Sequence, residues 1–125
     1  MSKRIVLDVG NCGPDHASIR NMLTASFDVD VIKADSLTDT LQQLNANDVA
    51  LVLINRKLDI DYSDGIEILR SIKAEPSLES VPVMMVTNYE EHQDQAVSAG
   101  ALRGFGKLQL SDAKTKERLA EVLAK

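Results

Sequence analysis

Short apolar runs rich in β-branched residues alternate along this chain with stretches whose apolar residues recur at helical spacing. The run 49–54 is apolar at every position, which is typical of a strand covered on both faces. Such alternation predicts a parallel sheet with helices packed on both sides. The expected strands are 5–9, 29–34, 49–54, 81–86 and 102–106, and the expected helices begin near Asp15, Ser36, Gly65, Glu90 and either Ser111 or Asp112.

The composition limits the partners that this domain can have. The 125 residues fit one domain, and 44% of them are apolar, enough to bury a core. Aromatic residues make up only 3%, which argues against a stacking platform for single-stranded nucleic acid. The net charge of −5 disfavours DNA and anionic membranes, because both would repel the protein. We therefore expect neither a nucleic-acid nor a membrane partner for this domain.

Cysteine content and the first residues suggest where the chain resides. A single cysteine, Cys12, cannot form an intramolecular disulfide, and no Cys/His cluster has the spacing of a metal site. The first apolar run is broken by Asp8 and is too short for a signal peptide or a membrane span. These features predict a cytoplasmic protein. No nucleophile–base pair is evident, so we do not expect an enzyme.

Three segments carry a resemblance to a known family. They are 64–73 (DGIEILRSIK), 81–87 (VPVMMVT) and 99–101 (AGA), the last followed by Lys107. Their order and spacing resemble the response-regulator receiver domains of two-component signalling, over nearly the whole chain. The resemblance implies an α/β, flavodoxin-like (βα)5 three-layer sandwich with a central five-stranded parallel sheet, and a single receiver-like domain over residues 1–125.

In that family a carboxylate at the end of the third strand accepts a phosphoryl group from a phosphohistidine. A pair of acids after the first strand helps to hold Mg²⁺, and a Ser/Thr and a Lys hold the phosphoryl oxygens. An aromatic residue on the fifth strand reports whether the site is occupied. Positioning and charge neutralisation are the general logic of phosphoryl transfer. Thr87 and Lys107 match the hydroxyl and the lysine of this pattern.

The other positions of the pattern have changed. Asn55 stands where the phosphoacceptor is expected, and an amide lacks the charge that makes a carboxylate nucleophilic. Gly10 and Asn11 occupy the positions of the acid pair. Gly104 occupies the aromatic position, with Phe105 one residue late and hence expected on the other face of the strand. Lys107 is followed by leucine rather than proline, and the loop 55–63 is longer than the family's.

These departures predict a degenerate receiver, or pseudo-receiver, that keeps the fold and works through protein–protein contacts without standard aspartyl phosphorylation. We expect no cofactor, and Mg²⁺ binding that is weak or absent. The partners would be proteins of a signalling pathway, such as a histidine kinase or an output domain. By resemblance, the recognition surface is the face of the last two helices and the strand between them. Its charged candidates are Glu90, Glu91, Asp94, Arg103, Lys114, Lys116 and Arg118.

Two alternative functions remain open from the sequence. A working phosphorelay receiver could use a non-standard acid, with Asp8 brought to the pocket by a slipped register and with Asp59 or Asp61 as acceptor. Alternatively, Lys107 with Arg56 and Lys57 could make the pocket a site for an anion or another small ligand.

The remaining reactive side chains are expected to have structural roles only. His16 and His92 are both expected to be solvated surface residues, and Cys12 a small, partly buried side chain.

Overall fold

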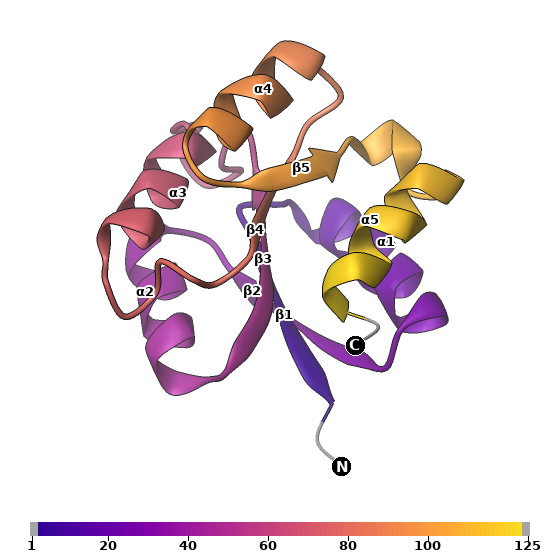
Figure 1. Cartoon of the computed structure of the whole chain (residues 1–125), viewed down its shortest axis with the longest axis horizontal. Coiled ribbons are helices and arrows are strands. Elements are labelled where there is room, and N and C mark those ends of the chain that lie inside the picture. Colours follow the sequence, from indigo (N-terminus) through magenta and orange to yellow (C-terminus); the bar gives the residue numbers. More distant parts are fainter. Residues whose placement is uncertain (1–2, 124–125) are drawn as a thin grey trace.

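The computed structural model describes residues 3–123 of the chain (Figure 1). Five parallel strands form one sheet in the order β2-β1-β3-β4-β5, which confirms the predicted flavodoxin-like α/β fold. The strands are β1 (Arg4–Val9), β2 (Val29–Ala34), β3 (Val49–Asn55), β4 (Val83–Val86) and β5 (Leu102–Phe105). The helices are α1 (Gly13–Ser26), α2 (Leu37–Ala46), α3 (Gly65–Ala74), α4 (Glu90–Ser98) and α5 (Ala113–Leu123), with a short 3₁₀ helix, η1 (Lys107–Gln109), before α5.

Several boundaries differ from the predicted ones by one or two residues, and one short helix was not expected. Strand β4 begins two residues later than expected, next to Pro82, which has no N–H to donate to a neighbouring strand. The carbonyl of Pro82 still accepts a hydrogen bond from the Val52 N–H at 2.9 Å. Helix η1 was not predicted at all, because three residues are too few to show a helical period.

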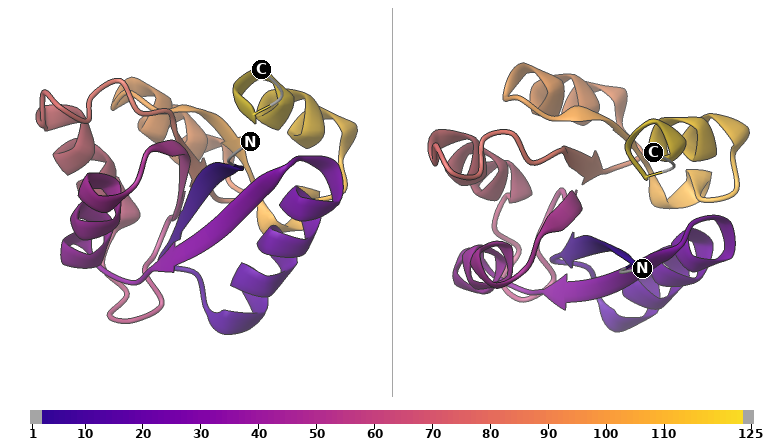
Figure 2. Two further views of the ribbon diagram at one scale, coloured as in Figure 1. Left: turned by 90° about the horizontal axis from the view of Figure 1, so that it is seen from below. Right: turned by 60° about the horizontal axis from the view of Figure 1, so that its bottom comes forward.

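The sheet lies between two helical layers that bury opposite sides of each strand (Figures 1 and 2). In β1, Leu7 and Val9 face the layer of α2, α3 and α4, whereas Val6 faces the layer of α1 and α5. From Leu51 to Ile54 the apolar run in β3 divides in the same alternating way, which explains why a strand covered on both faces needs apolar residues at every position.

Helix α2 shows how the local sequence sets an element's start. The Ser36 side chain accepts a hydrogen bond from the Asp39 N–H at 3.2 Å, as the capping pattern predicts. The Asp39 carboxylate in turn accepts from the Asp35 N–H at 3.2 Å. Two backbone donors at the helix start are thereby satisfied.

The strand order also fixes where a site can form. The chain passes from β1 outward to β2 and then returns across β1 to β3, so the order reverses between β1 and β3. The carboxyl ends of these two strands lead into Gly10 and Asn55, and that of β4 leads into Thr87. This is where open parallel sheets bind ligands. Among residues 3–123, no helix is long and apolar enough to cross a membrane.

Candidate functional site

The turn after β1 is closed by the loop that follows β3. Gly10 has a φ of +79°, a left-handed conformation that favours glycine. A Cβ atom at Gly10 would lie 2.3 Å from Cδ2 of Leu58, whose side chain is buried. The Asp59 N–H also donates to the Gly10 carbonyl at 2.9 Å. Leu58 thus covers the end of β1 where the family places its acid pair.

Asn55 fastens this loop to the sheet. Its Nδ2 donates to the carbonyl of Lys57 at 2.7 Å and to the carbonyl of Gly10 at 3.3 Å. Both contacts require a donor, and an ionised carboxylate has none. The residue predicted to stand at the phosphoacceptor position therefore serves as a hydrogen-bond donor to the backbone.

The rest of the loop folds back on itself as a small hairpin. Lys57 and Asp64 pair as an antiparallel bridge, and their side chains form an ion pair at 2.6 Å. The hydrogen bond from Lys57 lowers the pKa of the Asp64 carboxyl. Asp59 and Asp61 are exposed, and Asp61 accepts hydrogen bonds from the N–H and hydroxyl of Ser63.

Asp8 lies inside β1, in register with Lys33 and Leu53, and its side chain is fully buried. One carboxyl oxygen accepts a hydrogen bond from Asn11 Nδ2, and the other lies 2.7 Å from Nδ1 of His16. Burial raises the pKa of the Asp8 carboxyl above its ordinary value, although the hydrogen bonds from His16 and Asn11 act in the opposite direction. Asn11 is turned toward Asp8, and its own Oδ1 is buried without a partner.

The two histidines correct the expectation that both are solvated. The His16 side chain is only 18% exposed, since it lies three residues before buried Ile19 on the inward side of α1. His92 is half-buried, and its Nδ1 is completely buried. Each ring lies three or four residues from a buried side chain of its own helix, a periodicity that could have identified both as inward-facing.

Lys107 begins η1 and forms an ion pair with Asp15 of α1, with Nζ 2.6 Å from Oδ2. Both side chains are about one-third exposed, and the hydrogen bond from Lys107 lowers the pKa of the Asp15 carboxyl. Thr87 is buried, and its hydroxyl accepts from the Tyr89 N–H at 3.3 Å. Within residues 3–123, no hydrogen bond joins Lys107 to Thr87 or to Asn55. Asp15 was missed in the sequence because nothing local links it to a lysine 92 positions away.

Gly104, the position predicted for the family's switching aromatic residue, has no room for a side chain beside the backbone of β4. A Cβ atom at Gly104 would lie 2.3 Å from the carbonyl oxygen of Met85. Phe105 is 1% exposed and packs in the core between the sheet and the α1/α5 layer. Helix α4 is held over the same strands by Gln93, whose side chain donates to the carbonyls of Met85 and Thr87 and accepts from the Gly104 N–H.

Comparison with known proteins agrees with this geometry. Residues 15–112 match the family described as the response regulator receiver domain. The chain belongs to this family. A response regulator from Chloroflexus aurantiacus, described in its structure as putative, shares 18% identity and a TM-score of 0.81, with 99% of this chain and 100% of that chain covered.

Two further solved structures have the receiver fold. The N-terminal domain of a response regulator receiver protein from Methanoculleus marisnigri is 25% identical, with a TM-score of 0.71 and 99% of each chain covered. The signal receiver domain of a signal transduction histidine kinase from Syntrophus aciditrophicus is 17% identical, with a TM-score of 0.72, and the match covers 95% of this chain and 92% of that one. Receiver domains of response-regulator signalling are thus the class to which this chain is assigned.

Proposed function

We propose that this receiver domain is a pseudo-receiver, which transmits a signal through protein contacts without phosphorylation at the end of β3. The observation that carries the proposal is the donor role of Asn55, whose Nδ2 is bound to the carbonyls of Lys57 and Gly10. A side chain that must donate there cannot be a carboxylate, and an amide is not a nucleophile for phosphoryl transfer.

The surroundings of Asn55 also lack the charges that Mg²⁺ requires. A magnesium ion is bound through carboxylates and phosphates, in near-octahedral geometry. The two positions after β1 are Gly10 and Asn11, and the nearby Asp8 is buried and bound to His16 and Asn11. Across the described part of the chain, 3–123, no three acidic, histidine or cysteine side chains cluster as metal ligands. We infer that neither Mg²⁺ nor another cofactor takes part.

The recognition surface proposed by resemblance is the face of α4, β5 and α5 (Figure 1). Val97 and Leu102 are exposed apolar side chains on it. Arg103 links Glu90, at 2.6 Å, with Asp94, so part of its charge is already paired within the domain. The partners in this proposal are proteins of a signalling pathway, such as a histidine kinase or an output domain.

The two alternative functions have less support. Asp59 and Asp61 are exposed on the loop, but neither has a hydrogen bond or ion pair with Thr87 or Lys107 among the described residues. For an anion site built on Lys107, Arg56 and Lys57, two of the three cations are already paired, Lys107 with Asp15 and Lys57 with Asp64. An added anion would have to compete with these carboxylates.

Intact-mass measurement after incubation with acetyl phosphate and Mg²⁺ tests the proposal. We expect no gain of a phosphoryl group, whereas a receiver that retains the acceptor aspartate, treated in parallel, should gain one. A gain that is lost in Asp59→Asn or Asp61→Asn would establish the phosphorelay alternative instead. A gain that survives both substitutions, with the modified residue mapped elsewhere by peptide sequencing, would equally overturn the proposal that this domain works without phosphorylation.

A further inference from the structure

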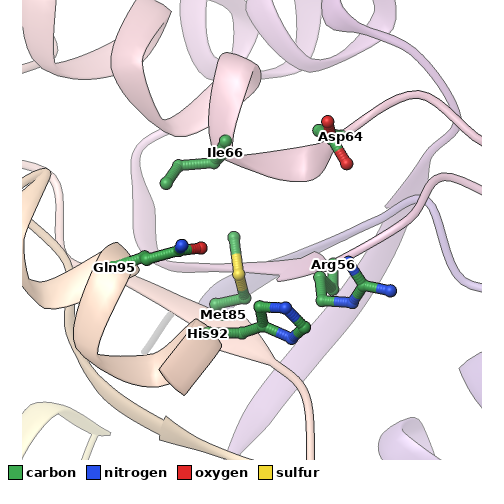
Figure 3. A pocket seen from close by; sticks show the side chains of 6 residues that line it. All are labelled: Arg56, Asp64, Ile66, Met85, His92 and Gln95. Carbon is green, nitrogen blue, oxygen red and sulfur yellow. The ribbon is translucent and has the colours of Figure 1, made fainter. Parts of the chain in front are cut away.

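A hollow lies beside the end of β3, between α3 and α4 (Figure 3). Its volume is about 220 Å³. The residues that line it are Arg56, Asp64, Ile66, Met85, His92 and Gln95. A more open groove of about 400 Å³ continues from it along α3 and α4, since Ile66 and Gln95 line both. The hollow opens into the α2/α3/α4 layer, whereas Lys107 pairs with α1 of the other layer.

The floor of this hollow is apolar and its walls are polar. Met85 is a buried residue of β4, and Figure 3 shows its side chain directed between Gln95 and Arg56 toward Ile66. The side chains of Arg56 and Gln95 make no hydrogen bond or ion pair with other residues in the range 3–123. Arg56 is nevertheless half-buried, so its guanidinium is held near the hollow and lacks a fixed acceptor.

His92 adds a third polar group with unused bonding capacity. Its Nδ1 is buried and has no hydrogen-bond partner among residues 3–123. A buried N–H with no acceptor is costly, so the neutral ring carries its proton on Nε2. Nε2 also makes no hydrogen bond within the described chain, and the ring lies beside Arg56 in Figure 3. The wall formed by Arg56, His92 and Gln95 thus offers donors.

The charge around the hollow favours an anion. The carboxylate that lines it, Asp64, is already paired with Lys57 at 2.6 Å. On α4, Glu90 and Asp94 are both held by Arg103. Arg56 is near enough to help lower the pKa of the Asp64 carboxyl, but it forms no direct ion pair among the described residues. A guanidinium binds planar carboxylates with two parallel hydrogen bonds.

We propose that the hollow binds a small organic anion, a carboxylate carrying a compact apolar group. The carboxylate pairs with Arg56 and accepts from His92 or Gln95, while the apolar group covers Met85 and Ile66. The volume suits a ligand of about ten non-hydrogen atoms, smaller than most drug-sized ligands. Arg56 follows Asn55 in the chain and Asp64 pairs with Lys57, so the hollow adjoins the loop that Asn55 binds. Asn55 does not itself line the hollow, and the proposed binding does not require phosphorylation at that residue.

Titration of the full chain with benzoate, followed by NMR of the methionine methyl groups and backbone amides, tests the proposal. Benzoate should bind with a Kd on the order of 1 mM, because a fragment of this size has limited binding energy. The Met85 methyl and the amides of α4 should shift, and those near Lys107 should not. Benzamide, which has the same shape without the charge, should bind at least about tenfold more weakly.

Two matched variants test whether the charge of Arg56 is responsible for benzoate binding. Arg56→Gln should weaken benzoate binding at least about tenfold. Arg20→Gln makes the same change on exposed α1, in the other helical layer, and should leave the Kd unchanged. Equal binding of benzoate by the wild type and Arg56→Gln, or equal binding of benzoate and benzamide, would overturn the proposal. So would wild-type shifts confined to the Lys107 region, a readout that needs no variant to fold.

Discussion

Asn55 stands where the resemblance predicts the phosphoacceptor, and its contacts predict the effect of placing an aspartate there. Asn55→Asp would place a carboxylate against the carbonyls of Lys57 and Gly10, both of which need a donor. We expect a loss of about 1–3 kcal/mol in the free energy of unfolding at neutral pH. Urea unfolding measures it.

The control for this substitution is Asn21→Asp on the exposed face of α1, which should change stability by no more than about 0.5 kcal/mol. A carboxylate at position 55 can donate again once protonated, so the loss should shrink in acid. An Asn55→Asp protein as stable as the wild type at neutral pH would contradict the donor role that we assign to Asn55.

The buried Asp8 carboxyl predicts that the free energy of unfolding depends on pH with the opposite sign to that expected from most surface carboxylates. Its folded-state pKa is raised, chiefly by burial, so the unfolded chain ionises first as the pH rises. Asp8 therefore lowers the free energy of unfolding between its ordinary pKa and its raised pKa. The variant Asp8→Asn has no carboxyl to ionise at this position, so it does not lose this stability. Its stability relative to wild type should increase with pH, by about 1.4 kcal/mol for each unit of pKa shift.

Urea unfolding at several pH values from about 4 upward measures this difference. Asp28→Asn, at an exposed position before β2, controls for the removal of one carboxylate. The interpretation of Asp8 would be wrong if the difference between Asp8→Asn and wild type stayed constant, or fell, as the pH rose.

At the scale of elements, the turn after β1 and the loop after β3 depend on each other, and two glycines of the same segment test this. Gly10→Ala requires a left-handed backbone and places Cβ against Leu58, so we expect a loss of about 1–3 kcal/mol in the free energy of unfolding. Gly13, the first residue of α1, has no atom within 4 Å of a Cβ position. Gly13→Ala should be neutral or stabilising by up to about 1 kcal/mol.

The same urea-unfolding measurement serves for both glycine variants, and chemical shifts of the loop amides report whether Leu58 has moved. If Gly10→Ala were as stable as Gly13→Ala and left the loop signals in place, Leu58 could not be packed against the turn.

The helices and strands could be predicted from the sequence because each depends on residues that are close together in the chain. The site was harder to predict because its contacts join residues that are far apart in the chain. The apolar run of β3 and the Ser36 cap each depend on residues within a few positions, and the structure confirms both. The partner of Lys107 lies 92 residues away, on α1. Sequence analysis identified the substitution at Asn55, but not the hydrogen bonds that use its Nδ2, which exist only once the loop is folded onto Gly10.

At the scale of the whole molecule, ligand linkage separates a working receiver from the domain that we propose. Beryllofluoride and Mg²⁺ together imitate a phosphoryl group on a carboxylate, and a ligand at one hundred times its Kd stabilises its site by about 2.7 kcal/mol. Here the β3 end holds an amide, and Gln93 fixes α4 to Met85, Thr87 and Gly104 in one arrangement. We therefore expect no rise in Tm with beryllofluoride and Mg²⁺.

Differential scanning calorimetry makes this test on the intact chain, with Mg²⁺ alone and fluoride alone as controls for general salt effects. For a receiver that binds the pair, about 2.7 kcal/mol corresponds to a rise of several degrees in a domain of this size. Such a rise here, abolished by Lys107→Met, would mean that Lys107 leaves Asp15 to hold the bound group. The absence of such a rise is the result expected if Lys107 keeps its ion pair with Asp15 and Asn55 keeps its donor contacts to Lys57 and Gly10.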